Sequence, residues 1–237
     1  MRILALDTAT EGCSVALLQS GPGASATWEV RELEPGRGAS ELILPLVQSV
    51  LTEAGLELKA LSGIAFGRGP GGFTGVRLAA SVAQGLAFGA GLPVVPVSDL
   101  LAVAQQLFDE IPTARGVVVC NDARMREVYW TCCERDPGGL ARLVSPERVS
   151  AMDMVQWPRA LTAEAQVYGA GRGFTAYPEL AQRLGPGLAG IRAQMLPRAR
   201  EIAWLAQAQL EAGEGVAAEQ ALPVYLRNDV AKTAKPK

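Results

Sequence analysis

Apolar residues in this chain gather in runs of strand length that alternate with longer segments of helical periodicity. The runs are bounded by Gly, Pro, Asp and Ser, which is typical of strands and helices separated by short turns. The first half predicts strands at 1–8, 13–18 and 26–32, a helix at 40–54, a strand at 64–66, a helix at 74–89, a strand at 94–97 and a helix at 98–108.

The second half repeats the opening plan after a boundary at Ile111-Pro112. An apolar strand at 117–122 ends in an Asp, and strands at 127–132 and near Leu143 follow. An internal duplication of this kind is itself a fold signal. Beyond it we expect a strand at 165–168 that enters a second Gly-rich loop, a helix at 178–184, a long helix near 197–212 and a short basic, solvated end at 232–237.

These elements predict an α/β protein of two duplicated βββαβα domains. The chain has 237 residues, and about 100 to 200 residues per domain allows one large or two smaller units. We expect an N-terminal domain of residues 1–108 and a C-terminal domain of residues 109–237, with the last long helix in the second domain.

The helices at 40–54 and 74–89 carry more apolar residues than the single stripe that covers a sheet. One face of each helix would cover the sheet and the other a partner, or the two helices would bury each other and a helix of the second domain. The expected partner surface consists of Leu42, Ile43, Leu46, Val47, Val50, Arg77, Leu78, Ser81, Val82 and Leu86.

An uncharged stretch at 78–98 has the length of a membrane-spanning helix. Several glycines and two prolines break it into a helix and a strand, so no membrane segment is predicted.

The composition excludes several kinds of catalytic and binding site. The hydrophobic fraction of 49% and charged fraction of 19% indicate an ordered globular chain, and a net charge of −2 argues against RNA binding by its own basic surface. There is no histidine, which removes the usual general base and Ser-His or Cys-His nucleophile pairs. The four cysteines show no metal-site or disulfide spacing, and we expect reduced cytosolic thiols, with Cys132 and Cys133 on opposite sides of a strand.

The loop from Gly67 to Arg77, Gly-Arg-Gly-Pro-Gly-Gly-Phe-Thr-Gly-Val-Arg, separates a strand from a helix that Thr74 can cap. It is consistent with a phosphate cradle at a helix N-terminus, although it lacks the Lys-Ser/Thr of a P-loop. The spacing does not support that site, and a tight turn that packs a helix against a sheet is the favoured alternative.

The same loop resembles the signature of the TsaB family, also called YeaZ, with Gly72 in place of the usual Ser. Further matches span nearly the whole chain: residues 5–8 with 13–17, 96–100, 122–129 (Asp-Ala-Arg-Met-Arg-Glu-Val-Tyr) and 223–227. The resemblance implies the fold shared by actin, sugar kinases and heat-shock chaperones.

The resemblance also implies a role. TsaB proteins are similar to TsaD, the catalytic subunit that transfers threonylcarbamoyl to the adenosine beside the tRNA anticodon. The His-x-x-x-His metal site of TsaD is absent from the matching helix, which opens Gly38-Ala39-Ser40-Glu41-Leu42. A cytoplasmic, non-catalytic subunit without cofactor or metal of its own is therefore expected. Its partners would be TsaD, TsaE and a second copy of itself, ATP and metal would belong to the partner subunits, and tRNA would be met only through the complex.

Two alternatives remain open. Asp7 and Thr8 match positions where kinases and actins of this fold hold metal and phosphate, so they are candidates for a vestigial nucleotide site, although Glu11 would repel phosphate. Asp7 and Asp122 would otherwise cap turns. The rival function is a stand-alone protease-like or nucleotide-dependent enzyme of the same superfamily, and a third possibility is a purely homodimeric scaffold without TsaD.

Overall fold

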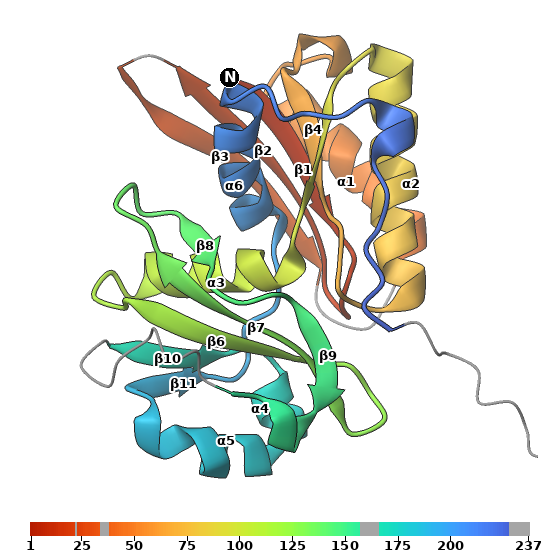
Figure 1. Cartoon of the computed structure of the whole chain (residues 1–237). Coiled ribbons are helices and arrows are strands. Elements are labelled where there is room, and N and C mark those ends of the chain that lie inside the picture. Colours follow the sequence, from red (N-terminus) through yellow and green to blue (C-terminus); the bar gives the residue numbers. More distant parts are fainter. Residues whose placement is uncertain (22, 34–37, 157–165, 228–237) are drawn as a thin grey trace, which may run out of the picture.

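A computed structural model describes residues 1–21, 23–33, 38–156 and 166–227 (Figure 1). The basic end predicted at 232–237 lies outside these residues. The described chain contains two β-sheets with helices between and around them, and each sheet with its adjoining loops is called a lobe below.

The N-terminal sheet has the strand order β3-β2-β1-β4-β5. Strands β1, β4 and β5 are parallel, and β1 pairs with β2 in an antiparallel hairpin, as the two opening apolar runs predict. Its inner strands are buried on both faces, which explains why they read as continuous apolar runs. The bounds are β1 (Arg2–Asp7), β2 (Cys13–Gly21), β3 (Ala24–Leu33), β4 (Gly63–Gly67) and β5 (Val94–Val97).

The C-terminal sheet repeats this topology, with the order β11-β10-β6-β7-β8 and a further strand, β9, paired with β7. Strands β6, β10 and β11 are parallel, and β6 pairs antiparallel with β7. The duplicated α/β plan is therefore confirmed. Strands β9 and β11 escape prediction because they are short and mostly half-exposed. The bounds are β6 (Gly116–Asp122), β7 (Glu127–Arg135), β8 (Ala141–Leu143), β9 (Arg148–Ala151), β10 (Val167–Ala170) and β11 (Gly190–Arg192).

The helices form layers around the sheets (Figure 1). Helices α1 and α2 cover one face of the N-terminal sheet and α6 covers the other, while α3 lies between α6 and the C-terminal sheet, and α4 packs on the far face of that sheet beside α5. The bounds are α1 (Ala39–Glu53), α2 (Phe73–Ala90), α3 (Asp99–Glu110), α4 (Gly173–Ala176), α5 (Pro178–Leu184) and α6 (Ala199–Glu211), with short 3₁₀ turns at Leu58–Ala60, Met152–Met154, Gly185–Gly187 and Ala218–Gln220.

Helices α3 and α6 each pack on the sheet formed by the other half of the chain. Helix α6, expected with the C-terminal domain, packs on β1, β2, β4 and β5 of the N-terminal sheet, and α3 packs on β6, β7 and β8. The backbone N–H of Ala199, at the start of α6, donates to Ser14 Oγ on β2 at 2.8 Å. One hydrophobic core, with Leu107 and Ile202 fully buried, therefore spans both lobes.

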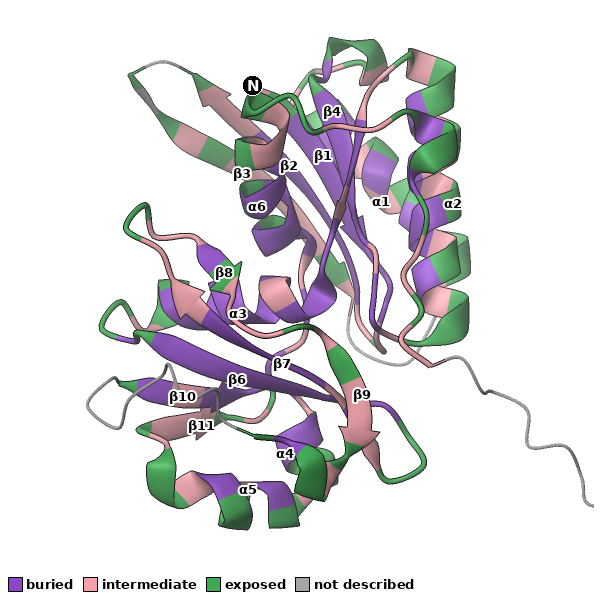
Figure 2. Ribbon diagram, in the orientation of Figure 1, coloured by how far each residue is buried: buried purple, intermediate pink, exposed green. Residues whose placement is uncertain are grey.

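Figure 2 shows that burial concentrates in the two sheets and the helices between them. Cys132 and Cys133 point to opposite faces of β7, as strand alternation predicts, and because both faces are covered both thiols are buried. Of the helices in the described part of the chain, none combines the length and hydropathy that a bilayer crossing needs.

Candidate functional site

The Gly-rich loop packs directly on the turn that joins β1 to β2. Gly72 N–H donates to the Ala9 carbonyl at 2.7 Å, and the Thr8 hydroxyl donates to the Gly75 carbonyl at 2.7 Å. A Cβ on Gly75 would collide with the Thr8 carbonyl, so the glycine is required for this close approach. Thr74 does not cap α2; Gly72 is the N-cap and makes no side-chain capping bond. The loop's contacts are those of a packing turn.

Two buried carboxyl groups lie beneath this loop. A Cβ on Gly67 would collide with both Asp7 and Asp99, and each carboxyl keeps one oxygen without a hydrogen-bond partner among the described residues. Asp99 accepts from the backbone N–H of Gly69. Burial raises the pKa of Asp7 to about 6 and, together with the neighbouring Asp7 charge, raises the pKa of Asp99 well above its usual range. One proton shared by the two carboxyls accounts for this arrangement.

The nucleotide candidates Asp7 and Thr8 are 1% and 2% exposed, and neither lines the cleft between the lobes. Asp7 Oδ1 accepts from Ala9 N–H at 2.9 Å, and Asp122 Oδ1 accepts from Arg124 N–H at 2.8 Å. Both aspartates thus cap turns, as one of the two interpretations from sequence predicts. The side chains of Asp7 and Thr8 therefore make hydrogen bonds within the N-terminal lobe.

The cleft itself has a volume of about 960 Å³. It lies at the C-terminal ends of β1 and β6, and Glu11 from the N-terminal lobe forms an ion pair there with Arg172 from the C-terminal lobe. Glu11 therefore neutralises the Arg172 guanidinium, which would otherwise be available to bind an anion. Arg77, Arg124 and Arg227 also line the cleft, as does Asp122.

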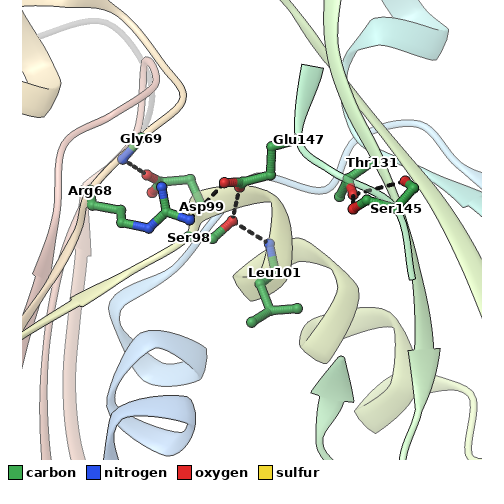
Figure 3. Close-up of polar contacts among 8 residues, drawn as sticks. All are labelled: Arg68, Gly69, Ser98, Asp99, Leu101, Thr131, Ser145 and Glu147. Carbon is green, nitrogen blue, oxygen red and sulfur yellow. Dashed lines mark hydrogen bonds and ion pairs between the residues drawn. The ribbon is translucent and has the colours of Figure 1, made fainter. Parts of the chain in front are cut away.

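One polar network joins the lobes (Figure 3). Arg68, which follows β4, pairs with Glu147 of the C-terminal lobe at 2.6 Å, and Ser98 donates to the same carboxylate. Ser98 Oγ also accepts from Leu101 N–H at 3.1 Å and so caps α3. The Arg68 and Glu147 side chains are 20% and 8% exposed, so this pair is shielded from solvent far more than the surface ion pairs.

The turn from Arg124 to Arg126 is unusual, because three successive non-glycine residues have φ of 63°, 56° and 62°. The left-handed region is unfavourable for such residues and is often found at functional sites. Met125 and the two arginine side chains are exposed there. This turn belongs to the segment 122–129 that the sequence singled out.

The expected partner surface divides into a buried and an accessible part. Ile43, Val47 and Val50 are buried in the chain's own core against the N-terminal sheet, because they occupy the inner stripe of α1. They are corrected to core residues. The remaining expected residues are exposed or half-buried, and the half-buried ones, Leu46, Leu78, Val82 and Leu86, also pack against the core; the exposed ones are Leu42, Arg77 and Ser81.

The structure adds exposed apolar side chains that the prediction omitted. Leu44 on α1 is 53% exposed, and Phe73 and Phe88 on α2 are 54% and 81% exposed. Leu44 lies in an apolar run and Phe73 in the Gly-rich signature, so both signals were visible in the sequence. Leu222 and Tyr225 join them only through the tertiary structure.

Leu222 and Tyr225 belong to the segment 216–227, which we call the strap. The strap begins with a β-bridge between Val216 and Val94, runs beside α2 and ends at the cleft (Figure 1). Gln84 Nε2 on α2 donates to the Ala221 carbonyl at 2.9 Å, and Val224 N–H donates to the Arg68 carbonyl at 2.7 Å. The strap therefore packs beside α2, and α1 and α2 cover the same face of the N-terminal sheet.

Comparison with known proteins identifies the family of this chain. Residues 35–235 match the family model described as TsaD, tRNA N6-adenosine threonylcarbamoyltransferase. The chain is 41% identical, over 98% of its length and 96% of the relative's, to the tRNA threonylcarbamoyladenosine biosynthesis protein TsaB of Escherichia coli. The chain belongs to the TsaB family. The TsaB protein of Haemophilus influenzae is 36% identical over 97% of this chain and 95% of its own length.

A solved structure agrees. An uncharacterized Pseudomonas aeruginosa protein with similarity to peptidase YeaZ superimposes with a TM-score of 0.83 at 42% identity, covering 95% of this chain and 99% of that one. In this TsaB-family chain the Gly-rich signature lines the cleft and forms the start of α2. The chain's two sheets share one strand topology, which is the duplicated α/β plan that the sequence predicts.

Proposed function

We propose that this chain is a non-catalytic subunit that binds TsaD, with TsaE, during threonylcarbamoyl transfer to the adenosine next to the tRNA anticodon. The supporting observation is the distribution of exposed apolar side chains. Of the nine large hydrophobic residues exposed in the described chain, six lie on α1, α2 or the strap: Leu42, Leu44, Phe73, Phe88, Leu222 and Tyr225. Contiguous exposed apolar surface marks interaction sites on soluble proteins.

The outer side of α2 also suits close helix packing. Ser81 and Gly85 lie four residues apart and Gly89 four further on, and nothing lies within 4 Å of a Cβ built on Gly85 or Gly89. Small residues let a second helix approach the backbone closely, while Phe88 supplies apolar area beside them. A second copy of the chain fits the same face, so self-association and TsaD binding would compete.

We assign the binding of ATP and metal to the partner subunits. Asp7 and Thr8 are used inside the N-terminal lobe, and Glu11 holds Arg172 in the cleft, which disfavours phosphate there. ATP and metal would thus be bound by the partner subunits, and tRNA would be contacted only through the complex, in the cytoplasm. ATP turnover by the isolated chain would instead favour the alternative of a stand-alone nucleotide-dependent or protease-like enzyme.

The test is a pair of matched substitutions. Leu44→Arg places a charge in the proposed interface, and Met154→Arg places one on the C-terminal lobe at a residue of similar exposure, 57% against 53%. An unpaired charge in an apolar interface costs several kcal/mol, so Leu44→Arg should weaken TsaD binding about 100-fold or more. Calorimetry with purified TsaD measures the Kd, and circular dichroism checks the fold. Equal binding by both variants would reject the proposed interface.

A further inference from the structure

One guanidinium on this surface is held in a defined orientation by aromatic rings. The Cζ atom of Arg77 lies 3.6 Å from the ring centroid of Phe73 and 5.4 Å from that of Tyr225. Arg77 Nε–H donates to the Tyr225 hydroxyl at 2.7 Å, and the two ring centroids are 6.0 Å apart. Cation–π contacts of this kind fix the guanidinium plane.

Its charge is unpaired within the described part of the chain. Several arginines there have a carboxylate within ion-pair distance, among them Arg31 with Glu53 and Arg192 with Glu110, and others have none. Arg77 is exposed and has none, and its only hydrogen bond among the described residues uses Nε. Its two terminal nitrogens therefore retain donors that match a carboxylate in geometry.

The strap makes this arrangement rigid before any partner arrives. Tyr225 follows Val224, whose N–H is bonded to Arg68, and Arg227 forms an ion pair with Glu127 on the C-terminal lobe. Tyr225 is consequently anchored on both sides along the chain. A side chain that is already ordered loses little entropy on binding, which favours its use as an interface anchor.

We infer that Arg77, clamped by Phe73 and Tyr225, receives a carboxylate of TsaD at the cleft end of the α1–α2 face. This inference rests on the proposed function and assigns the polar anchor of that interface. Tyr and Arg are enriched among residues that dominate binding energy, and Phe73 and Tyr225 are 54% and 44% exposed around the guanidinium. A protein carboxylate fits better than a free phosphate because the site continues into an apolar surface that a protein partner would cover.

The experiment compares Arg77→Ala, Arg77→Lys and Tyr225→Phe with a matched control. Arg200 offers that control, because it is also exposed and lies 5.3 Å from the ring centroid of Trp28, on the opposite side of the N-terminal sheet. The Kd for TsaD is measured by calorimetry at low and high salt. We expect Arg77→Ala to weaken binding about 10- to 100-fold and to reduce its salt dependence.

Arg77→Lys should restore part of the affinity, since it keeps the charge but loses the planar fork. Tyr225→Phe should weaken binding less than Arg77→Ala, and Arg200→Ala should bind like the natural chain. If Arg77→Ala binds normally while Leu44→Arg fails, the inference is rejected and the proposed interface stands. If both bind normally, the proposed function fails as well. A weaker Arg77→Ala complex with unchanged salt dependence would reduce Arg77 to a structural role and overturn the inference.

Discussion

The buried pair of Asp7 and Asp99 makes stability depend on pH in a calculable direction. Burial raises the folded-state pKa of Asp7 from 3.8 to about 6, so between these values the native state binds more protons than the unfolded chain. Stability contributed by the shared proton is complete below about pH 4 and is lost as pH rises through about 6. At 1.36 kcal/mol per pH unit, the loss for Asp7 is about 3 kcal/mol.

Asp99→Asn should leave the Asp7 loss, which comes from burial, and should remove the further loss that comes from Asp99, whose pKa is raised by burial and by the Asp7 charge. The amide oxygen can still accept from Gly69 N–H, and the amide nitrogen can donate to ionised Asp7, so no buried charge repels another. We expect the variant to exceed the natural chain in stability at pH 8, because there the unfolded natural chain ionises Asp99 while the native state keeps it protonated, and to differ little at pH 4.

Urea unfolding followed by circular dichroism at pH 4, 6 and 8 measures this difference. Asp153→Asn is the matched control, because Asp153 is exposed and the substitution should leave the pH profile unchanged. An Asp99→Asn variant that is less stable than the natural chain at pH 8, or whose stability falls as much as that of the natural chain between pH 4 and 8, would show that Asp99 is not held protonated beside Asp7.

Two further predictions concern packing and the joint between the lobes. Gly75→Ala should lower the free energy of unfolding in urea by at least about 3 kcal/mol, since its Cβ would collide with the Thr8 carbonyl. Gly85→Ala on the same helix, where space is open, should raise the free energy of unfolding by about 0.5–1 kcal/mol. Equal effects would disprove the close-packing argument. Glu147→Ala should cost about 1.5–3 kcal/mol in thermal unfolding because Arg68 loses its shielded partner, whereas Glu53→Ala, from an exposed pair, should cost under about 1 kcal/mol; a Glu147→Ala cost no larger than that of Glu53→Ala would contradict it.

Local patterns were sufficient for the elements and for the duplication. The opening strands, the two partner-surface helices and the repeat beginning at residue 117 appear where the apolar periodicity predicts them. The short strands β9 and β11 were missed because runs of three or four mixed residues carry no periodic signal. The packing of α6 on the N-terminal sheet was missed because an amphipathic pattern does not say which sheet a helix covers.

The candidate site was predicted in composition and only partly in geometry. An over-apolar helix indicates two buried faces but does not distinguish them, and Ile43, Val47 and Val50 therefore entered the expected surface although they belong to the core. The contact between Arg77 and Tyr225 joins residues 148 positions apart, which sequence reasoning on one chain cannot detect.

The amino-acid sequence by itself determined the α/β class, the duplicated plan and the resemblance to the TsaB family, because these depend on local apolar periodicity and short motifs. Only the tertiary structure decided that α6 joins the N-terminal sheet, that Asp7 and Asp99 share one buried site, and that the strap clamps Arg77. These features come from contacts between distant segments, whose energies depend on which surfaces meet when the chain folds.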